Sequence, residues 1–239
     1  MGGRPRQDST GLGERQPSTI LAVAGWHHIP RRYHRDMTPG TALGCLETDA
    51  GRTWVAATDQ GVVAIDRGES PLPLLGWLER RLPGANPEIR PSPMLDRAAA
   101  AIRAGLDGDQ AAADTPIDAT GATPFERAVW TAVRAIPYGS VATYGEVAAA
   151  AGRPQAARAV GRVMARCPLW PIVPCHRVVR ADGALGGWGA DPAEKRRLLE
   201  LERRRAPGSA ATSWASPARR PGPSRRPPVP SRSASRGDR

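Results

Sequence analysis

The sequence predicts a mixed α/β protein, in which a small antiparallel sheet with two helices precedes a mainly helical half. Three short apolar and β-branched runs, separated by turn residues, predict the sheet between residues 43 and 65. Two apolar stripes with helical spacing follow between residues 74 and 102. Beyond residue 122, capping sequences and short loops alternate, so we expect that half to be mostly helical.

Composition narrows the class of protein. The chain has 239 residues, of which 40% are hydrophobic but only 5% aromatic, so the core must be mainly aliphatic. Three cysteines without paired short spacing argue against a disulfide framework or a zinc knuckle and favour a reducing compartment. The apolar run at 20–24 is too short for a signal sequence, and no run approaches the roughly 18 residues of a membrane span. We therefore expect a soluble, cytoplasmic protein.

The net charge of +11 is unevenly distributed. Residues 203–239 carry +9 and residues 1–38 carry +3. Between these segments, residues 39–120 carry −5, whereas residues 121–202 carry +4. An acidic half beside a basic half indicates that only the second half meets a polyanion.

The same shifts divide the chain into five segments. We predict a disordered basic extension at 1–38, a first folded unit at 39–107, a polar linker at 108–122, a second folded unit at 123–202 and a disordered Arg/Pro/Ser-rich tail at 203–239. Three histidines in the extension lack cysteines or carboxylates at ligand spacing, which favours a solvated basic segment over a metal site.

The second unit contains a predicted helix-turn-helix. A capping pattern begins at Thr143, and the turn at Gly152 leads into a helix expected over 155–166. On that helix arginines recur every four residues and therefore share one face. The stripe consists of Arg158, Arg162 and Arg166. A solvated face is the ordinary interpretation of such a stripe, but small neighbours such as Ala157 permit close approach to a partner and favour contact with nucleic acid.

The stretch Pro174-Cys-His-Arg-Val178 carries the strongest chemical signal. Apolar residues on both sides favour a buried strand that presents one thiol. A free cysteine is most often a core residue, and that interpretation is adopted for Cys45. A neighbouring imidazole, however, can generate the nucleophilic thiolate. Successive strand residues point to opposite faces, so Cys175 and His176 need either a bent backbone or a bridging water.

Five segments together resemble the O6-alkylguanine-DNA alkyltransferases in order and spacing. They are Thr123-Pro-Phe-Glu-Arg-Ala-Val-Trp130, Ile136-Pro-Tyr-Gly139, Thr143-Tyr-Gly-Glu-Val147, Ala156-Ala-Arg-Ala-Val-Gly161 and Pro174-Cys-His-Arg-Val178. The resemblance covers residues 121–202 and extends loosely over 40–105, where that family has a ribonuclease-H-like subdomain. It implies a monomeric, nucleoid-associated DNA repair protein that needs no cofactor and has no metal among its site residues.

The resemblance also implies roles for individual residues. The protein would flip O6-alkylguanine out of double-stranded DNA and transfer the alkyl group irreversibly to Cys175. His176 would deprotonate the thiol through a water, Glu202 would orient His176, and Tyr144 would protonate the departing guanine. Arg158 would fill the gap left in the base stack, on a helix that enters the minor groove. The residues expected to line the base pocket are Met164, Val178, Trp188 and Gly189.

Three positions depart from the family pattern. Cys167 stands where an asparagine usually braces the turn after the DNA-binding helix. Trp170 and Trp188 add bulk at positions expected beside the pocket, which predicts a narrower range of lesions. Two alternatives remain open: a lesion-binding protein without transfer activity, and a helix-turn-helix regulator. The presence of Cys175 favours transfer over the first, and the regulator leaves the Pro-Cys-His-Arg segment unexplained.

Overall fold

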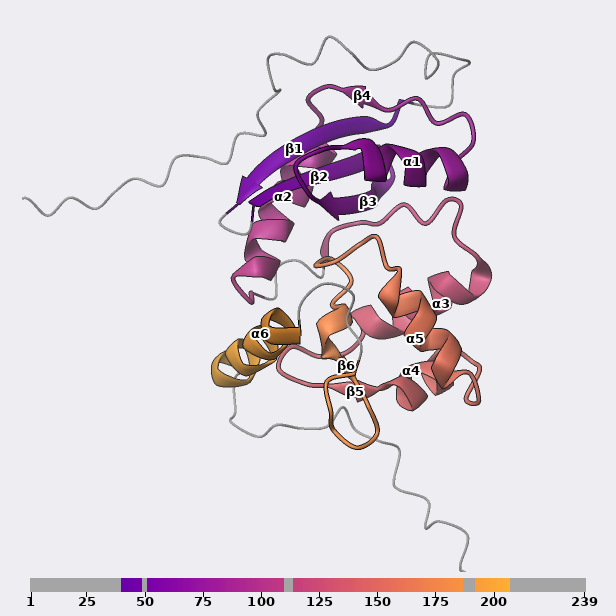
Figure 1. Ribbon diagram of the computed structural model, residues 1–239, viewed down its shortest axis with the longest axis vertical. Helices are drawn as coiled ribbons and strands as arrows, with labels where there is room; N and C mark the ends of the chain where they lie inside the picture. The colour runs from indigo at the N-terminus through magenta and orange to yellow at the C-terminus, as the bar shows by residue number, and fades with distance from the viewer. Residues whose placement is uncertain (1–39, 49–50, 110–113, 187–191, 207–239) are drawn as a thin grey trace, which may run out of the picture.

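A four-stranded sheet organises the N-terminal half of the computed structural model (Figure 1). The structure describes residues 40–48, 51–109, 114–186 and 192–206. Strands β1 (Ala42–Thr48), β2 (Gly51–Thr58) and β3 (Gly61–Arg67) form the predicted antiparallel meander. The short strand β4 (Glu88–Ile89) adds to β1 in parallel, giving the order β3-β2-β1-β4. Sequence pattern did not predict β4, because two residues are too few to show alternation.

Each face of the sheet is covered by one of the two predicted helices. Helix α1 (Leu72–Arg81) packs in a cluster with Leu43, Cys45 and Trp54, so the core role predicted for Cys45 is confirmed. Helix α2 (Pro93–Leu106) packs with the opposite face. That second cluster continues into the C-terminal half, and one apolar core therefore joins the sheet to the helices around the site.

The predicted linker at 108–122 is more than a connector in its described part. The Val62 N–H donates to the Pro116 carbonyl at 3.0 Å, and the Asp118 N–H donates back to the Val62 carbonyl at 2.9 Å. The hydroxyl of Thr58 also donates to the Asp118 carboxylate at 2.7 Å. The two backbone bonds run along β3 and the third comes from the end of β2, which the polar composition of the segment did not reveal.

The helical half begins as the sequence predicts. Helices α3 (Pro124–Arg134) and α4 (Tyr144–Ala150) each open with a complete capping box, in which a threonine and a glutamate satisfy each other's backbone N–H groups. The turn after α4 contains Gly152 at φ +76°, and α5 (Ala157–Ala165) follows. Helix α5 is shorter at both ends than the expected 155–166.

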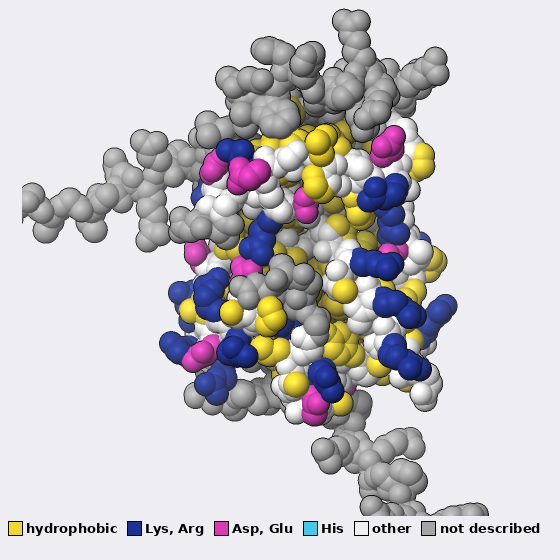
Figure 2. Space-filling model, viewed as in Figure 1, with side chains coloured by type: hydrophobic (Ala, Val, Ile, Leu, Met, Phe, Trp, Pro, Cys, Tyr) yellow, Lys and Arg dark blue, Asp and Glu magenta, His cyan; other side chains and the backbone are white. Residues whose placement is uncertain are grey.

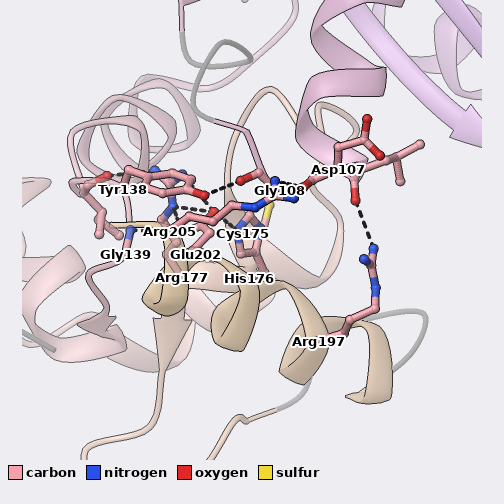
Figure 3. A network of polar contacts seen from close by, with 12 residues as sticks. Asp107, Gly108, Tyr138, Gly139, Cys175, His176, Arg177, Arg197, Glu202 and Arg205 are labelled. Atoms are coloured by element: carbon pink, nitrogen blue, oxygen red, sulfur yellow. Dashed lines mark hydrogen bonds and ion pairs between the residues drawn. The ribbon is translucent and has the colours of Figure 1, made fainter. Parts of the chain in front are cut away.

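Helix α6 (Pro192–Arg205) corrects the predicted start of the tail at residue 203. Its last residues are folded, because the Arg205 guanidinium donates to the Asp107 carbonyl at 2.7 Å. Earlier in α6, Arg197 donates to the Leu106 carbonyl at 3.0 Å. Both acceptors lie at the C-terminal end of α2, where backbone carbonyls lack helical partners (Figure 3). None of the described helices is long and apolar enough to cross a membrane.

Candidate active site

Cys175 lies on a single turn of 3-10 helix, Cys175–Arg177, and not on the predicted strand. The Arg177 N–H donates to the Pro174 carbonyl at 3.0 Å and closes the turn. The extended chain resumes only at β6 (Val178–Val179), which pairs in parallel with β5 (Ala142–Thr143). The backbone is therefore bent at the thiol, which is one of the two solutions that the adjacent cysteine and histidine required. The thiol is also buried, with 2% of the residue exposed, so it is not presented at the surface.

His176 and Glu202 form a buried pair. The His176 Nε2 atom lies 2.7 Å from Oε1 of Glu202, which reaches the site from α6. Burial lowers the pKa of His176 despite the neighbouring carboxylate, so the imidazole is neutral at pH 7. A carboxylate only accepts hydrogen bonds, and Nε2 must therefore carry the ring proton. The lone pair of the neutral ring is consequently on Nδ1, which is buried and has no hydrogen-bond partner among the described residues.

Arg177 fixes the other side of the Glu202 carboxylate. Its Nε donates to Oε2 and its Nη2 donates to Oε1, both at 2.9 Å, while Nη1 donates to the Ile136 carbonyl at 2.9 Å. The Gly139 N–H adds a bond to Oε2 at 3.2 Å. Burial would raise the pKa of Glu202, but the bonds with His176 and Arg177 outweigh it and lower that pKa to about 2. Glu202 is thus ionised at any physiological pH and holds the imidazole in one tautomer.

The same network ties the site to the N-terminal half (Figure 3). The Tyr138 hydroxyl donates to the Gly108 carbonyl, just after α2. The Arg177 guanidinium lies 5.6 Å from the centre of the Tyr138 ring. Together with the bonds from α6 to the end of α2, these contacts fix the helix that carries Glu202 relative to the turn that carries Cys175.

Cys175 is a protonated thiol at rest. Its Sγ donates to the Val173 carbonyl at 3.2 Å. A hydrogen-bonding interaction with the Cys167 thiol, together with burial, raises the pKa of Cys175 well above its usual range. His176 is neutral and therefore does not offset these effects by stabilising a thiolate through its charge.

Lys195 places a buried positive charge near the thiol. No part of this residue is exposed, and its ammonium donates to the carbonyls of Val178 at 2.6 Å and Leu185 at 2.5 Å. Burial lowers the pKa of Lys195 to about 8, and its charge acts to lower the pKa of Cys175. It is the single lysine in a chain whose other cationic side chains, apart from histidine, are all arginines. That singularity was the sequence signal that could have identified it.

Tyr144, the first residue of α4, lies close to the thiol. Burial raises its pKa, and the charge of a Cys175 thiolate would raise it further. A Cβ atom on Gly186 would lie 2.9 Å from the Tyr144 hydroxyl oxygen, so only glycine fits there without a shift. Gly186 also has φ +70°, which favours glycine. The phenol is therefore confined against this loop.

The predicted pocket residues are only partly described. Met164 and Val178 are buried in the cluster that contains Cys175. Trp188 and Gly189 lie outside the described residues. The Arg67 guanidinium lies over the Trp170 ring, 4.7 Å from the centre of that ring. Arg67 also forms an ion pair with Glu194 of α6. Trp170 thus contacts β3, and its bulk is accommodated there.

The arginine stripe is exposed as expected. Arg158, Arg162 and Arg166 are all exposed on α5 or at its end, whereas Val160 and Met164 of the same helix are buried. Ala157 is half-buried at the start of the helix. Lys and Arg side chains gather along one edge of the lower half of the molecule, over α3 to α5 (Figure 2).

The structure pairs His176, next to Cys175 in the chain, with Glu202, and adds two residues to which the sequence pattern assigns no role. Arg177 belongs to the Pro-Cys-His-Arg segment and supplies most of the hydrogen bonds to Glu202. Lys195 donates to the Val178 carbonyl from α6. Within the described residues, no cluster of three or more His, Cys, Asp or Glu side chains could hold a metal ion.

These features define a class of protein. In this class a buried cysteine lies next to a hydrogen-bonded histidine and carboxylate, on a domain that exposes a basic helix. Residues 124–204 match the family model described as the DNA-binding domain of 6-O-methylguanine DNA methyltransferase. The crystal structure of Mycobacterium tuberculosis OGT in complex with DNA is 32% identical, with a TM-score of 0.54, over 71% of this chain and 96% of that one. The chain belongs to the 6-O-methylguanine-DNA methyltransferase family.

Two curated relatives carry the name methylated-DNA--protein-cysteine methyltransferase. The protein of Mycobacterium tuberculosis is 46% identical over 106 residues, which is 44% of this chain and 64% of the relative. The protein of Salmonella typhimurium is 50% identical over 95 residues, which is 40% of this chain and 56% of the relative. Each alignment therefore covers less than two thirds of the relative's length.

Proposed function

We propose that this protein repairs O6-alkylguanine in double-stranded DNA by transferring the alkyl group to Cys175, once per molecule. The observation that carries the proposal is the neutral His176, whose Nε2 is held by Glu202 and whose Nδ1 is free to accept a proton beside the buried thiol. The names of the relatives and of the DNA-bound structure support the same reaction class.

In the proposed reaction, the Cys175 proton passes to Nδ1 of His176, through a water if the two atoms are not in contact. The sulfur attacks the alkyl carbon, an S–C bond forms, and the C–O6 bond breaks with its electron pair going to guanine. The Tyr144 hydroxyl supplies the proton that the departing guanine needs. Glu202 stabilises the imidazolium, and the ammonium of Lys195 offsets the charge on the sulfur.

DNA engagement is proposed for the α4–α5 pair. The exposed arginines of α5 would contact phosphates, and Arg158, near its N-terminal end, would occupy the stack after the damaged base is flipped out. The buried position of Cys175 supports base flipping, because a thiol with 2% exposure cannot reach a base inside the duplex. We place the protein in the cytoplasm, with the nucleoid.

Intact-mass measurement after incubation with an O6-methylguanine oligonucleotide tests this function. One added methyl group per molecule is expected, located on Cys175 by peptide mapping. Cys175→Ala should bind the same oligonucleotide without gaining mass. Turnover beyond one equivalent, or methylation of the Cys175→Ala variant, would contradict the mechanism, and lesion binding without any mass gain would favour the non-transferring alternative.

A further inference from the structure

Cys167 is a second thiol at the site, and the proposed transfer does not use it. It follows α5, is half-buried, and packs against the cluster that includes Cys175. Eight residues separate Cys167 from Cys175 in the chain, and both belong to this one packed region. Consistent with that packing, the Cys167 thiol is the largest cause of the raised pKa of Cys175. The third cysteine, Cys45, belongs to the separate cluster under α1 and so lies apart from this pair.

The chain between the two thiols is short and held by hydrogen bonds. Residues 168–174 include three prolines, which limit backbone freedom. The Pro168 carbonyl accepts from the Ile65 N–H of β3 at 2.6 Å, and the Leu169 carbonyl accepts from the Val173 N–H at 2.9 Å. A short tether keeps the effective concentration of one thiol at the other high.

We propose that Cys167 and Cys175 form a redox-active pair that closes to an intramolecular disulfide when a hydroperoxide oxidises the protein. The formation of this bond requires only the two thiols and the oxidant. Its consequence for repair, the temporary loss of the alkyl acceptor, rests on the proposed function.

The chemistry proceeds in two balanced steps. The Cys167 thiol, the more exposed of the two, attacks one oxygen of hydrogen peroxide, giving a sulfenic acid and one water. The Cys175 sulfur then displaces hydroxide from the Cys167 sulfur, the S–S bond forms, and the hydroxide leaves as a second water with the Cys175 proton. Two electrons pass in total from the thiols to the peroxide. A dithiol reductant reverses the bond by exchange, whereas an alkylated Cys175 cannot be restored in this way.

The test is to treat the full-length protein, reduced and freed of reductant, with a small molar excess of hydrogen peroxide and to measure its mass. The expected product has lost two hydrogens, shows a peptide that links Cys167 to Cys175, and returns to the starting mass with dithiothreitol. Cys45→Ser should behave as the unmodified chain does. Cys167→Ser should show no loss of two hydrogens, because the buried Cys175 then has neither the more exposed thiol that reacts first nor a partner for the disulfide.

Methyl acceptance is then measured on each sample relative to its own untreated protein. In the unmodified chain and in Cys45→Ser, methyl acceptance should fall as the fraction of disulfide rises and recover with dithiothreitol. Cys167→Ser should not show this reversible loss. Oxygen adducts on Cys175 without the linked peptide would overturn the inference, as would equal reversibility in Cys167→Ser. If the linked peptide forms but the reduced protein accepts no methyl group, the proposed function fails and the disulfide inference stands.

Discussion

The Nε2 atom of His176 lies 2.7 Å from Oε1 of Glu202, and both side chains are almost entirely buried. Because Glu202 is ionised and accepts only, this contact leaves Nδ1 as the basic atom of the ring. The pair therefore determines which nitrogen of the imidazole can accept a proton.

Glu202→Gln should slow methyl transfer by about 100-fold, because a carboxamide neither fixes the tautomer nor stabilises the imidazolium. Single-turnover transfer with saturating lesion DNA measures this effect. Glu200→Gln is the matched control, since Glu200 is exposed on the same helix and pairs with Arg204. Equal rates for the two variants would remove Glu202 from the mechanism.

The free energy of unfolding should fall as the pH falls below 6.5. The folded pKa of His176 lies below its ordinary value of 6.5, so the unfolded chain binds this proton first and gains stability relative to the folded one. Glu202 adds a second loss between pH 4.5 and about 2, because its stabilisation is present only above its unfolded pKa and disappears as the pH falls through the folded one. This second loss is roughly 3 kcal/mol.

Urea unfolding at pH 7, 5.5, 4 and 3 gives the free energy of unfolding at each pH, and the differences between these values measure both losses. The Glu202→Gln variant should start less stable and lose less below pH 4.5 than the unmodified chain, because only the contribution of Glu202 is removed while those of Asp118 and Glu126 remain. A flat profile between pH 6.5 and 3 in the unmodified chain would contradict the assignment.

Lys195→Met should slow transfer at pH 7 and raise the pKa of Cys175, because the variant loses a buried cation near the thiolate. It also leaves the Val178 and Leu185 carbonyls without their donor, at a cost of about 1–3 kcal/mol each if they stay dry. The pH dependence of thiol reactivity separates the electrostatic role from simple destabilisation. Arg196→Met, at an exposed neighbour on α6, should change neither quantity.

Arg158→Ala and removal of residues 207–239 should have different effects. The removed segment carries seven arginines and one aspartate, so its loss should weaken general DNA binding and reduce the salt dependence, by about 0.9 in slope for each phosphate that is no longer neutralised. Transfer at saturating lesion DNA should persist. Arg158→Ala should slow transfer at saturation, with Arg180→Ala, another exposed arginine, as its control. The reverse pattern would show that the two regions have been assigned the wrong roles.

Cys167→Asn should stabilise the fold or speed transfer if the turn after α5 lacks a hydrogen-bonding brace, worth about 1–3 kcal/mol if the groups are buried. Asparagine would also remove the thiol contact that is the largest cause of the raised pKa of Cys175. Cys167→Ala removes that contact without adding a brace, so comparison of the two separates these effects. A lower melting temperature for Asn with a neutral Ala would instead mean that the thiol fills an apolar niche.

The sequence by itself determined much of the local structure. Alternation and turn residues predicted the β1–β3 meander, and the capping patterns at Thr123 and Thr143 located two helix starts, because these signals depend on neighbours in the chain. The link from Cys175 and His176 to Glu202 came from the family resemblance and not from spacing, and the structure places Glu202 against His176. Pattern alone did not show that the thiol is buried on a helical turn.

Tertiary structure decided the charge states and the contacts between distant segments. Lys195 and Arg177 are ordinary basic residues in the sequence, and only burial against backbone carbonyls and Glu202 makes them part of the site. The family pattern has an asparagine where this chain has Cys167. Packing of Cys167 near Cys175 raises the pKa of the Cys175 thiol. The pKa values, the tautomer of His176 and the pairing of two thiols all depend on desolvation and on neighbours far away in the chain, which local sequence does not encode.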